Sequence, residues 1–148
     1  IEGDKKPSSE YFMHRIFYRD RDDVGAVVHA HSTYSATLAA LHWEIEPIHY
    51  LIGYAGKNVR CAPYELFGTE KLAKEALEAM EDRNACLLAN HGLLAIGGTI
   101  EYAFDTAEEI EFVAELYYKA KCVGEPIPLK SEEMDEFLEK FKPYGKKL

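Results

Sequence analysis

Two histidines one residue apart, His29 and His31, are the part of this sequence best suited to chemistry. They follow the apolar run at residues 24–28, whose β-branched side chains are typical of a short buried strand. Residues i and i+2 of a strand project from the same face, so we expect the two imidazoles to lie side by side. Because neutral imidazole nitrogens are good zinc ligands, the pair predicts a metal site at the end of a strand.

A third ligand is expected from His91, which lies at the break between two short apolar segments. A turn at that position can present a side chain beside the end of a neighbouring strand. Three histidines with an open fourth position are the arrangement typical of catalytic zinc. The alternative interpretation is that all three are ordinary turn or core histidines. His14, His42 and His49 lack this spacing, and we assign them to packing or to the surface.

The elements that must position these residues follow from hydrophobic patterning and capping residues. Helices are predicted to begin near Ser8 and Ser9, to span residues 33–42, 69–82 and 99–123, and to begin again at Ser131. Strands are predicted at residues 24–31, 47–52, 59–62, 85–89 and 93–96. Since helices and strands alternate and the central strands are short, we expect one layered α/β domain over residues 1–148 with a mixed sheet.

Composition argues against several kinds of binding partner and favours a reducing compartment. With 26 acidic and 17 basic residues the net charge is −9, which argues against nucleic acid or an anionic membrane as a partner. Most of the acidic residues at positions 101–139 are interpreted as solvated helix faces. We find no signal peptide and no apolar stretch long enough to span a membrane. Three widely spaced cysteines, Cys61, Cys86 and Cys122, favour reduced thiols and a cytoplasmic location.

Several short motifs, taken together and in order, resemble the class II aldolase and adducin-like family. They are PSSE at 7–10, AVVHAH at 26–31, PIHY at 47–50, CAPY at 61–64, FGT at 67–69, NHG at 90–92 and FKPYG at 141–145. The resemblance implies a three-layer α/β/α domain with a central mixed, largely antiparallel sheet. It also implies a homotetramer with the active site at the subunit interface. The family domain has a further N-terminal segment, so we expect residues 1–148 to be one class II aldolase-like domain without that segment.

The resemblance also implies roles for the residues of the predicted metal site. His29, His31 and His91 match the ligands of one zinc ion per subunit. Glu10 matches the catalytic carboxylate, which acts as an acid and base. From the residues alone, Glu10 could equally be a first-turn acid favoured by the helix dipole.

Four further residues match the family's substrate-binding and catalytic groups. Ser8 and Ser9 match part of the pocket for the substrate phosphate. Tyr50 matches a catalytic tyrosine that reaches the site from a neighbouring subunit, and Tyr144 matches one in a C-terminal tail that closes over the site. Their alternative roles are helix capping for Ser9, core packing for Tyr50 and a solvated tail residue for Tyr144.

These residue types suit cleavage of a carbon–carbon bond beside a ketone. Such cleavage leaves an enediolate, whose charge a zinc ion stabilises as a Lewis acid. The implied activity is reversible cleavage of a ketose 1-phosphate, above all L-fuculose 1-phosphate, to dihydroxyacetone phosphate and L-lactaldehyde. A related dehydratase, a 4-epimerase and a non-catalytic adducin-like interaction module are alternatives. The related epimerases carry Asp at the position of Glu10, and adducin-like modules tend to lose the metal ligands.

Overall fold

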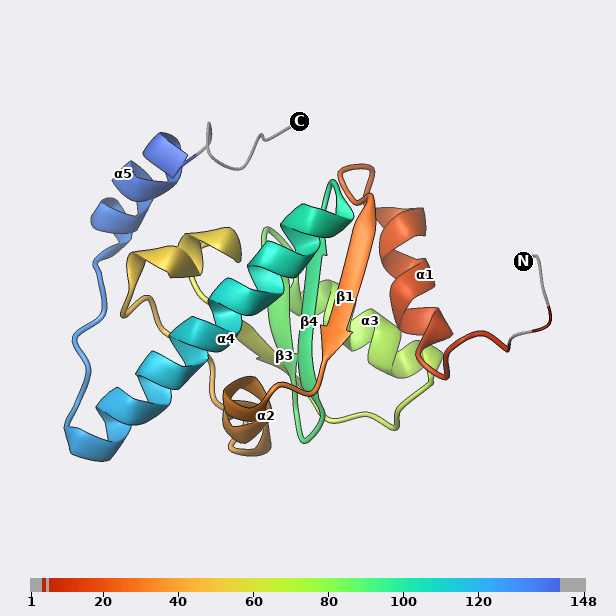
Figure 1. The fold of residues 1–148 in the computed structure, drawn as a ribbon, viewed down its shortest axis with the longest axis horizontal. Coiled ribbons are helices and arrows are strands. Elements are labelled where there is room, and N and C mark those ends of the chain that lie inside the picture. Colours follow the sequence, from red (N-terminus) through yellow and green to blue (C-terminus); the bar gives the residue numbers. More distant parts are fainter. Residues whose placement is uncertain (1–3, 5, 142–148) are drawn as a thin grey trace.

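The computed structural model describes residue 4 and residues 6–141 of the chain (Figure 1). In chain order the elements are α1 (Tyr11–Asp20), β1 (Ala26–Ala30), α2 (Thr33–Ala40), the 3-10 helix η1 (Tyr50–Tyr54), β2 (Arg60–Ala62), α3 (Glu70–Ala79), β3 (Ala85–Leu88), β4 (Gly92–Gly97), α4 (Ile100–Val123) and α5 (Ser131–Phe141). None of the described helices is both long enough and apolar enough to cross a membrane.

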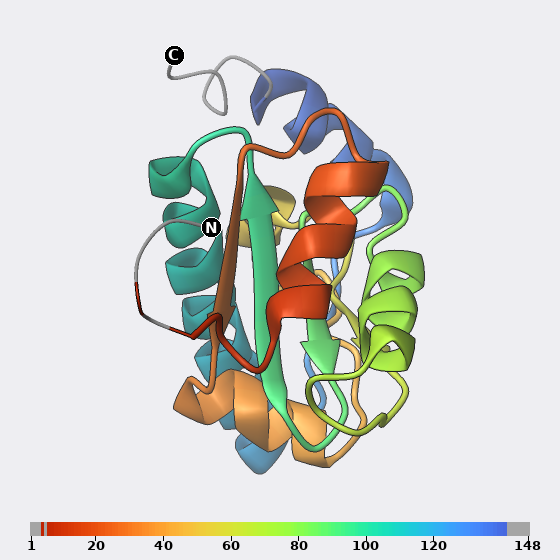
Figure 2. The same ribbon diagram turned by 90° about the vertical axis from the view of Figure 1, so that its right-hand side faces the viewer.

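The four strands form one mixed sheet in the order β1-β4-β3-β2. β4 pairs antiparallel with both β1 and β3, whereas β2 and β3 run parallel. The helices α2 and α4 cover one face of this sheet, and α1 and α3 cover the other (Figures 1 and 2). The predicted three-layer α/β/α domain with a largely antiparallel mixed sheet is therefore confirmed.

Alternation along the strands divides the buried side chains between the two faces. In β4, Leu93 packs into the apolar cluster under α2 and α4, while Leu94 packs into the cluster under α1 and α3. Val27 of β1 belongs to the α1 and α3 cluster. Because His29 lies two residues after Val27, strand geometry directs its imidazole to the same face, toward α1.

Capping threonines begin two of the helices as predicted. The Oγ1 of Thr69 accepts the N–H of Leu72 at the start of α3, and Thr99 accepts that of Tyr102 at the start of α4, each at 3.2 Å. These bonds satisfy backbone donors that have no partner within the helix. The long helix α4 ends at Val123, directly before Gly124, as the sequence predicts.

The predicted strand at residues 47–52 is wrong, since residues 47–49 belong to no strand and the 3-10 helix η1 begins at Tyr50. The ring of His49 accepts the N–H of Leu51 at 3.3 Å, and the His49 carbonyl accepts the N–H of Ile52 at 3.1 Å. Both bonds close a tight turn, which buries Ile52 in the cluster under α4. The apolar run indicated burial correctly, but local capping and tertiary packing decided the backbone conformation.

Candidate metal centre and catalytic site

Three histidines from two neighbouring segments of the sheet meet at one point. His29 lies in β1, His31 follows that strand, and His91 occupies the turn between β3 and β4. Their ligand atoms all lie within 4.8 Å of one another, and their ring centroids are 4.8 to 5.0 Å apart. Because β1 and β4 are adjacent strands, the turn that leads into β4 lies beside the end of β1. The predicted cluster of three histidines is thus formed.

The His29 ring is oriented by the sheet itself. Its Nδ1 lies 2.9 Å from the carbonyl oxygen of Leu93, so this nitrogen carries the proton and donates. Burial lowers the pKa of His29 to about 4, which keeps the ring neutral at neutral pH. The lone pair of Nε2 is then available, and this atom lies 3.0 Å from Nε2 of His31. Two ring nitrogens that converge in this way fit a shared divalent cation.

Gly92 allows the turn that carries His91 to approach β1. A Cβ atom at position 92 would lie 2.4 Å from the carbonyl oxygen of Ala30 and 3.0 Å from Cδ2 of His31. Backbone atoms cannot yield to such a contact without displacing the strand. The glycine after His91 is therefore required for the close approach of the three rings.

Glu10 is held next to the histidines at the start of α1. Its side chain is nearly buried, with 8% exposed, and its Oε2 accepts the N–H of Gly68 at 3.4 Å. Burial lowers the pKa of His91, and the negative charge of Glu10 opposes that shift. A nearly buried carboxylate that lines the same cavity as the three histidines differs from the solvated first-turn acid that the sequence alone also allowed.

One cavity of about 500 Å³ contains these groups. Its lining is formed by Ser8, Ser9, Glu10, His29, His31, Tyr64, Glu65, Phe67, Asn90 and His91. The volume is in the range of small-molecule sites. Of the two carboxylates, Glu65 forms an ion pair with Lys71 at 2.5 Å, which leaves Glu10 as the acid better placed for proton transfer.

The serines of the predicted phosphate pocket lie just before the N-terminal end of α1. Ser8 and Ser9 both line the cavity, and the Oγ of Ser8 accepts the N–H of Glu10 at 3.2 Å. The helix begins at Tyr11, two to three residues later than predicted, and no side-chain capping bond is formed at its N-cap. Because the Oγ of Ser8 accepts the N–H of Glu10 with a lone pair, its proton stays available to donate into the cavity.

Of the two predicted tyrosines, Tyr50 does not line this cavity. Tyr50 lies on η1, has 52% of its surface exposed and lines a separate hollow with Tyr54 and Phe137. Its role in a neighbouring subunit's site stays a prediction. Tyr144 lies outside the described residues.

Glu111 is an exception among the acidic residues, most of which are interpreted as solvated helix faces. Its carboxylate accepts hydrogen bonds from the Oγ of Ser32 and from the backbone N–H groups of Tyr34 and Ser35, at 2.7 to 2.8 Å. It therefore caps α2 directly after His31. The sequence does contain a signal, because Glu111 lies four residues after Ala107 and so falls on the buried side of α4.

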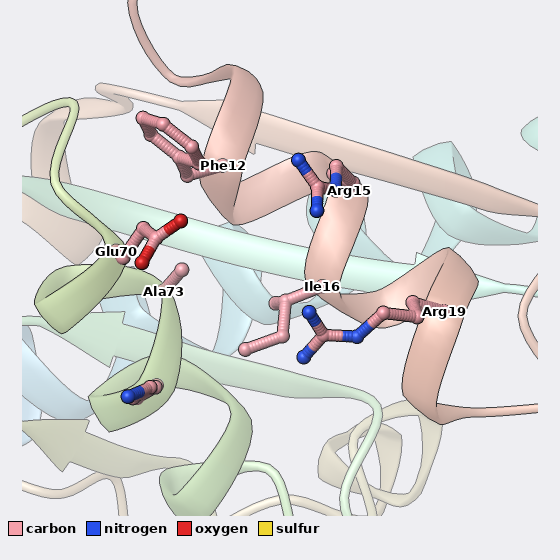
Figure 3. A pocket seen from close by; sticks show the side chains of 7 residues that line it. Phe12, Arg15, Ile16, Arg19, Glu70 and Ala73 are labelled. Carbon is pink, nitrogen blue, oxygen red and sulfur yellow. The ribbon is translucent and has the colours of Figure 1, made fainter.

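A second, much smaller hollow of about 60 Å³ lies between α1 and α3 (Figure 3). Arg15 and Arg19 of α1 line it opposite Glu70 of α3, and Arg19 forms an ion pair with Asp20 at 2.5 Å. It shares no lining residue with the histidine cavity. Its charges of both signs offset one another, so it does not compete with the histidine cavity as a candidate site.

The sequence and the fold of this chain were compared with those of known proteins, and the results agree with the site described above. The class II aldolase and adducin N-terminal domain family matches residues 1–118, and the chain belongs to this family. The predicted family membership is confirmed.

Individual relatives indicate which kind of class II aldolase the chain resembles. The chain is 56% identical over 145 residues to a 5-deoxy-D-ribulose 1-phosphate aldolase of Bacillus thuringiensis serovar kurstaki, covering 98% of the chain and 68% of the relative. It is 46% identical to a 5-methylthioribulose-1-phosphate/5-deoxyribulose-1-phosphate aldolase of Rhodospirillum rubrum, covering 97% and 65%. It is 42% identical to the L-fuculose phosphate aldolase of Escherichia coli K12, covering 97% and 68%. The chain thus spans about two thirds of the length of these relatives.

Solved structures with a similar fold are also aldolases. An L-fuculose 1-phosphate aldolase matches with a TM-score of 0.94 and 49% identity, over 96% of this chain and 67% of that chain. The chain is therefore a class II aldolase, a lyase of the fuculose-phosphate and ribulose-phosphate type. The alternative of a non-catalytic adducin-like module is not supported.

Proposed function

We propose that this chain catalyses the reversible, metal-dependent aldol cleavage of a ketose 1-phosphate. The observation that carries the proposal is the shared cavity of about 500 Å³, in which three histidines, Glu10 and two serines converge. Neutral imidazoles in this number favour zinc, and His29, His31 and His91 are the residues that would hold it. When bound, the ion supplies Lewis-acid stabilisation of the negative charge that develops on the ketone side of the substrate.

The protein's own residues account for the proton transfers. During cleavage the C4 hydroxyl loses a proton, the C3–C4 bond breaks with its electron pair left on C3, and C3 then gains a proton. We assign the exchange of the C3 proton to Glu10, because the other cavity carboxylate, Glu65, is paired with Lys71. Tyr50 of a neighbouring subunit and Tyr144 are our candidates for the proton on the C4 oxygen.

The serines are proposed to bind the phosphate. Ser8 and Ser9 line the cavity next to the N-terminal end of α1, where hydroxyl and backbone donors favour an anion. Holding the phosphate there fixes the substrate relative to Glu10 and the histidines.

For the sugar, we propose 5-deoxy-D-ribulose 1-phosphate as the preferred substrate and L-fuculose 1-phosphate as the second candidate. The relative named for the first sugar is 56% identical, whereas the two relatives named for the second are 42% and 49% identical. Cleavage between C3 and C4 releases dihydroxyacetone phosphate from both, with acetaldehyde from the first and L-lactaldehyde from the second. L-Fuculose 1-phosphate, the expectation from the sequence, stays a prediction.

A coupled assay for dihydroxyacetone phosphate tests the proposal. We expect zinc-dependent release from both sugars, with the higher kcat/KM for 5-deoxy-D-ribulose 1-phosphate. Chelation is expected to abolish the release and added zinc to restore it. No metal-dependent release from either ketose 1-phosphate would rule the proposal out.

We further propose a homotetramer that acts in the cytoplasm. Large side chains on η1 and α4, among them Tyr50, Phe104 and Phe112, are 42 to 52% exposed, which suits burial against another subunit. Light scattering in solution tests the assembly, and a monomeric mass would contradict it.

The proposed cytoplasmic location rests on the cysteines. All three are free thiols, in line with a reducing compartment.

A further inference from the structure

Asn90 lies directly before the metal ligand His91 and lines the same cavity. Its backbone adopts a left-handed conformation, with φ of 55°, which is uncommon for residues other than glycine. The backbone N–H of Asn90 donates to the carbonyl of Ala39 at 3.0 Å, and that of His91 donates to Leu88 at 2.9 Å. The turn thus fixes the point from which the Asn90 side chain projects.

His42 faces Asn90 from the end of α2. It too is left-handed, with φ of 56°, and its N–H donates to the same carbonyl of Ala39 at 3.1 Å. The two residues are therefore held to one backbone oxygen. Across this shared anchor, Nε2 of His42 lies 2.6 Å from Oδ1 of Asn90.

This contact determines which end of the carboxamide is free. The ring nitrogen donates and the amide oxygen accepts, so the oxygen of Asn90 is occupied by His42. The two N–H donors of the amide have no hydrogen-bond partner among the described residues, and Asn90 is exposed within the cavity. A ketose phosphate carries only oxygen atoms able to accept such donors: ketone, hydroxyl and phosphate.

We propose that Asn90 donates a hydrogen bond to a substrate oxygen and that His42 is the positioning residue that orients its amide. The inference rests on the proposed aldolase function. His42 does not line the histidine cavity but a groove with Trp43 and Tyr117, so it acts on the substrate through Asn90. His42 is exposed, as expected of a surface residue, and the proposal adds a role to that position.

Two pairs of variants, one at position 90 and one at position 42, test the two roles. Asn90→Gly removes the amide, and Asn90→Asp keeps its size but removes its donors. His42→Asn is too short to reach position 90, whereas His42→Gln keeps a donor at nearly the same distance. Each variant is measured for kcat, KM, zinc content and calorimetric binding of dihydroxyacetone phosphate. Asn58→Ala is the matched control, since Asn58 bonds to Arg83 and Glu44 away from the cavity.

We expect Asn90→Gly to weaken binding of dihydroxyacetone phosphate and to raise KM by about 3- to 10-fold, the effect of one hydrogen bond. Asn90→Asp is expected to lose more, because its charge repels the phosphate. His42→Asn should show part of the loss and His42→Gln should recover it. All variants are expected to keep one zinc per chain. In the Asn90→Gly background, His42→Asn is expected to have no further effect.

Three results would overturn the inference. The first is unchanged KM and unchanged binding of dihydroxyacetone phosphate in Asn90→Gly. The second is loss of zinc in that variant, which would mean that Asn90 supports His91 instead. The third is an additive effect of His42→Asn. Failure of the aldolase proposal is separate, since it is shown by absence of ketose 1-phosphate cleavage in the unmodified protein, whereas the binding measurement does not depend on turnover.

Discussion

At the scale of the residue, His29 has a separate task for each ring nitrogen. Nδ1 donates to Leu93, and burial lowers the pKa of the ring to about 4, so Nε2 faces the cavity with its lone pair. The alternation of strand residues predicted the pairing with His31, because that geometry is local. The Leu93 contact could not be predicted, since it joins residues 64 positions apart and depends on the register between β1 and β4.

Glu10→Gln tests the proton-transfer role at this scale. The amide keeps the shape of the side chain but cannot take up a proton, so we expect kcat to fall by about 10²- to 10⁴-fold. Zinc content and the unfolding midpoint are expected to stay unchanged, because the three proposed zinc ligands are all histidines and are still present. The coupled assay measures kcat, metal analysis measures the zinc content, and urea denaturation measures the unfolding midpoint.

The control is Glu78→Gln, which changes an exposed carboxylate on α3 outside the cavity. It is expected to leave kcat as it is. A Glu10→Gln enzyme with near-normal turnover would remove Glu10 from the acid and base role.

At the scale of the element, α2 links the two segments that carry the metal ligands. Glu111 caps its first turn next to His31, and His42 beyond its last turn contacts the residue before His91. The sequence predicted this helix at residues 33–42, but Ser32 at its N-cap donates to Glu111 instead of accepting a capping bond. The cap comes from another helix: the period of α4 places Glu111 on its buried side, but it does not show which N–H groups the carboxylate accepts.

Glu111→Ala is predicted to destabilise the fold at this junction. It removes three hydrogen bonds to a charged acceptor and leaves the N-terminal donors of α2 without their cap. We expect the free energy of unfolding to fall by roughly 2–3 kcal/mol, as measured by urea denaturation.

The comparison variant is Glu108→Ala, one turn earlier on the exposed side of α4. Its effect is expected to stay within about 0.5 kcal/mol. Equal unfolding midpoints for the two variants would show that the Glu111 cap contributes nothing.

At the scale of the whole molecule, an acidic protein is proposed to bind an anionic substrate. The net charge is −9, and the cavity itself contains Glu10 and Glu65. A phosphate entering such a field needs compensating positive charge, which a divalent cation and the donors near α1 supply. The resemblance predicted the layered fold correctly. The assembly that would bring Tyr50 to a site cannot be derived from one chain, because it depends on contacts between copies.

Removal of the metal is predicted to lower the thermal stability of the molecule. A ligand present at a thousand times its Kd stabilises the folded state by about 4 kcal/mol. For a chain of this size, that corresponds to a fall in Tm of roughly 8–16 °C on chelation. Calorimetric scans with and without chelator measure it. His29→Ala, which has lost a ligand, is expected to show no such response, and an equal response in both proteins would place the metal elsewhere.

The most direct test of the central claim is anomalous X-ray diffraction at the zinc edge from crystals of the zinc-loaded protein. We expect one peak per chain, about 2.0–2.1 Å from a ring nitrogen of each of His29, His31 and His91. No peak at the three histidines, or a peak held by other residues, would contradict it.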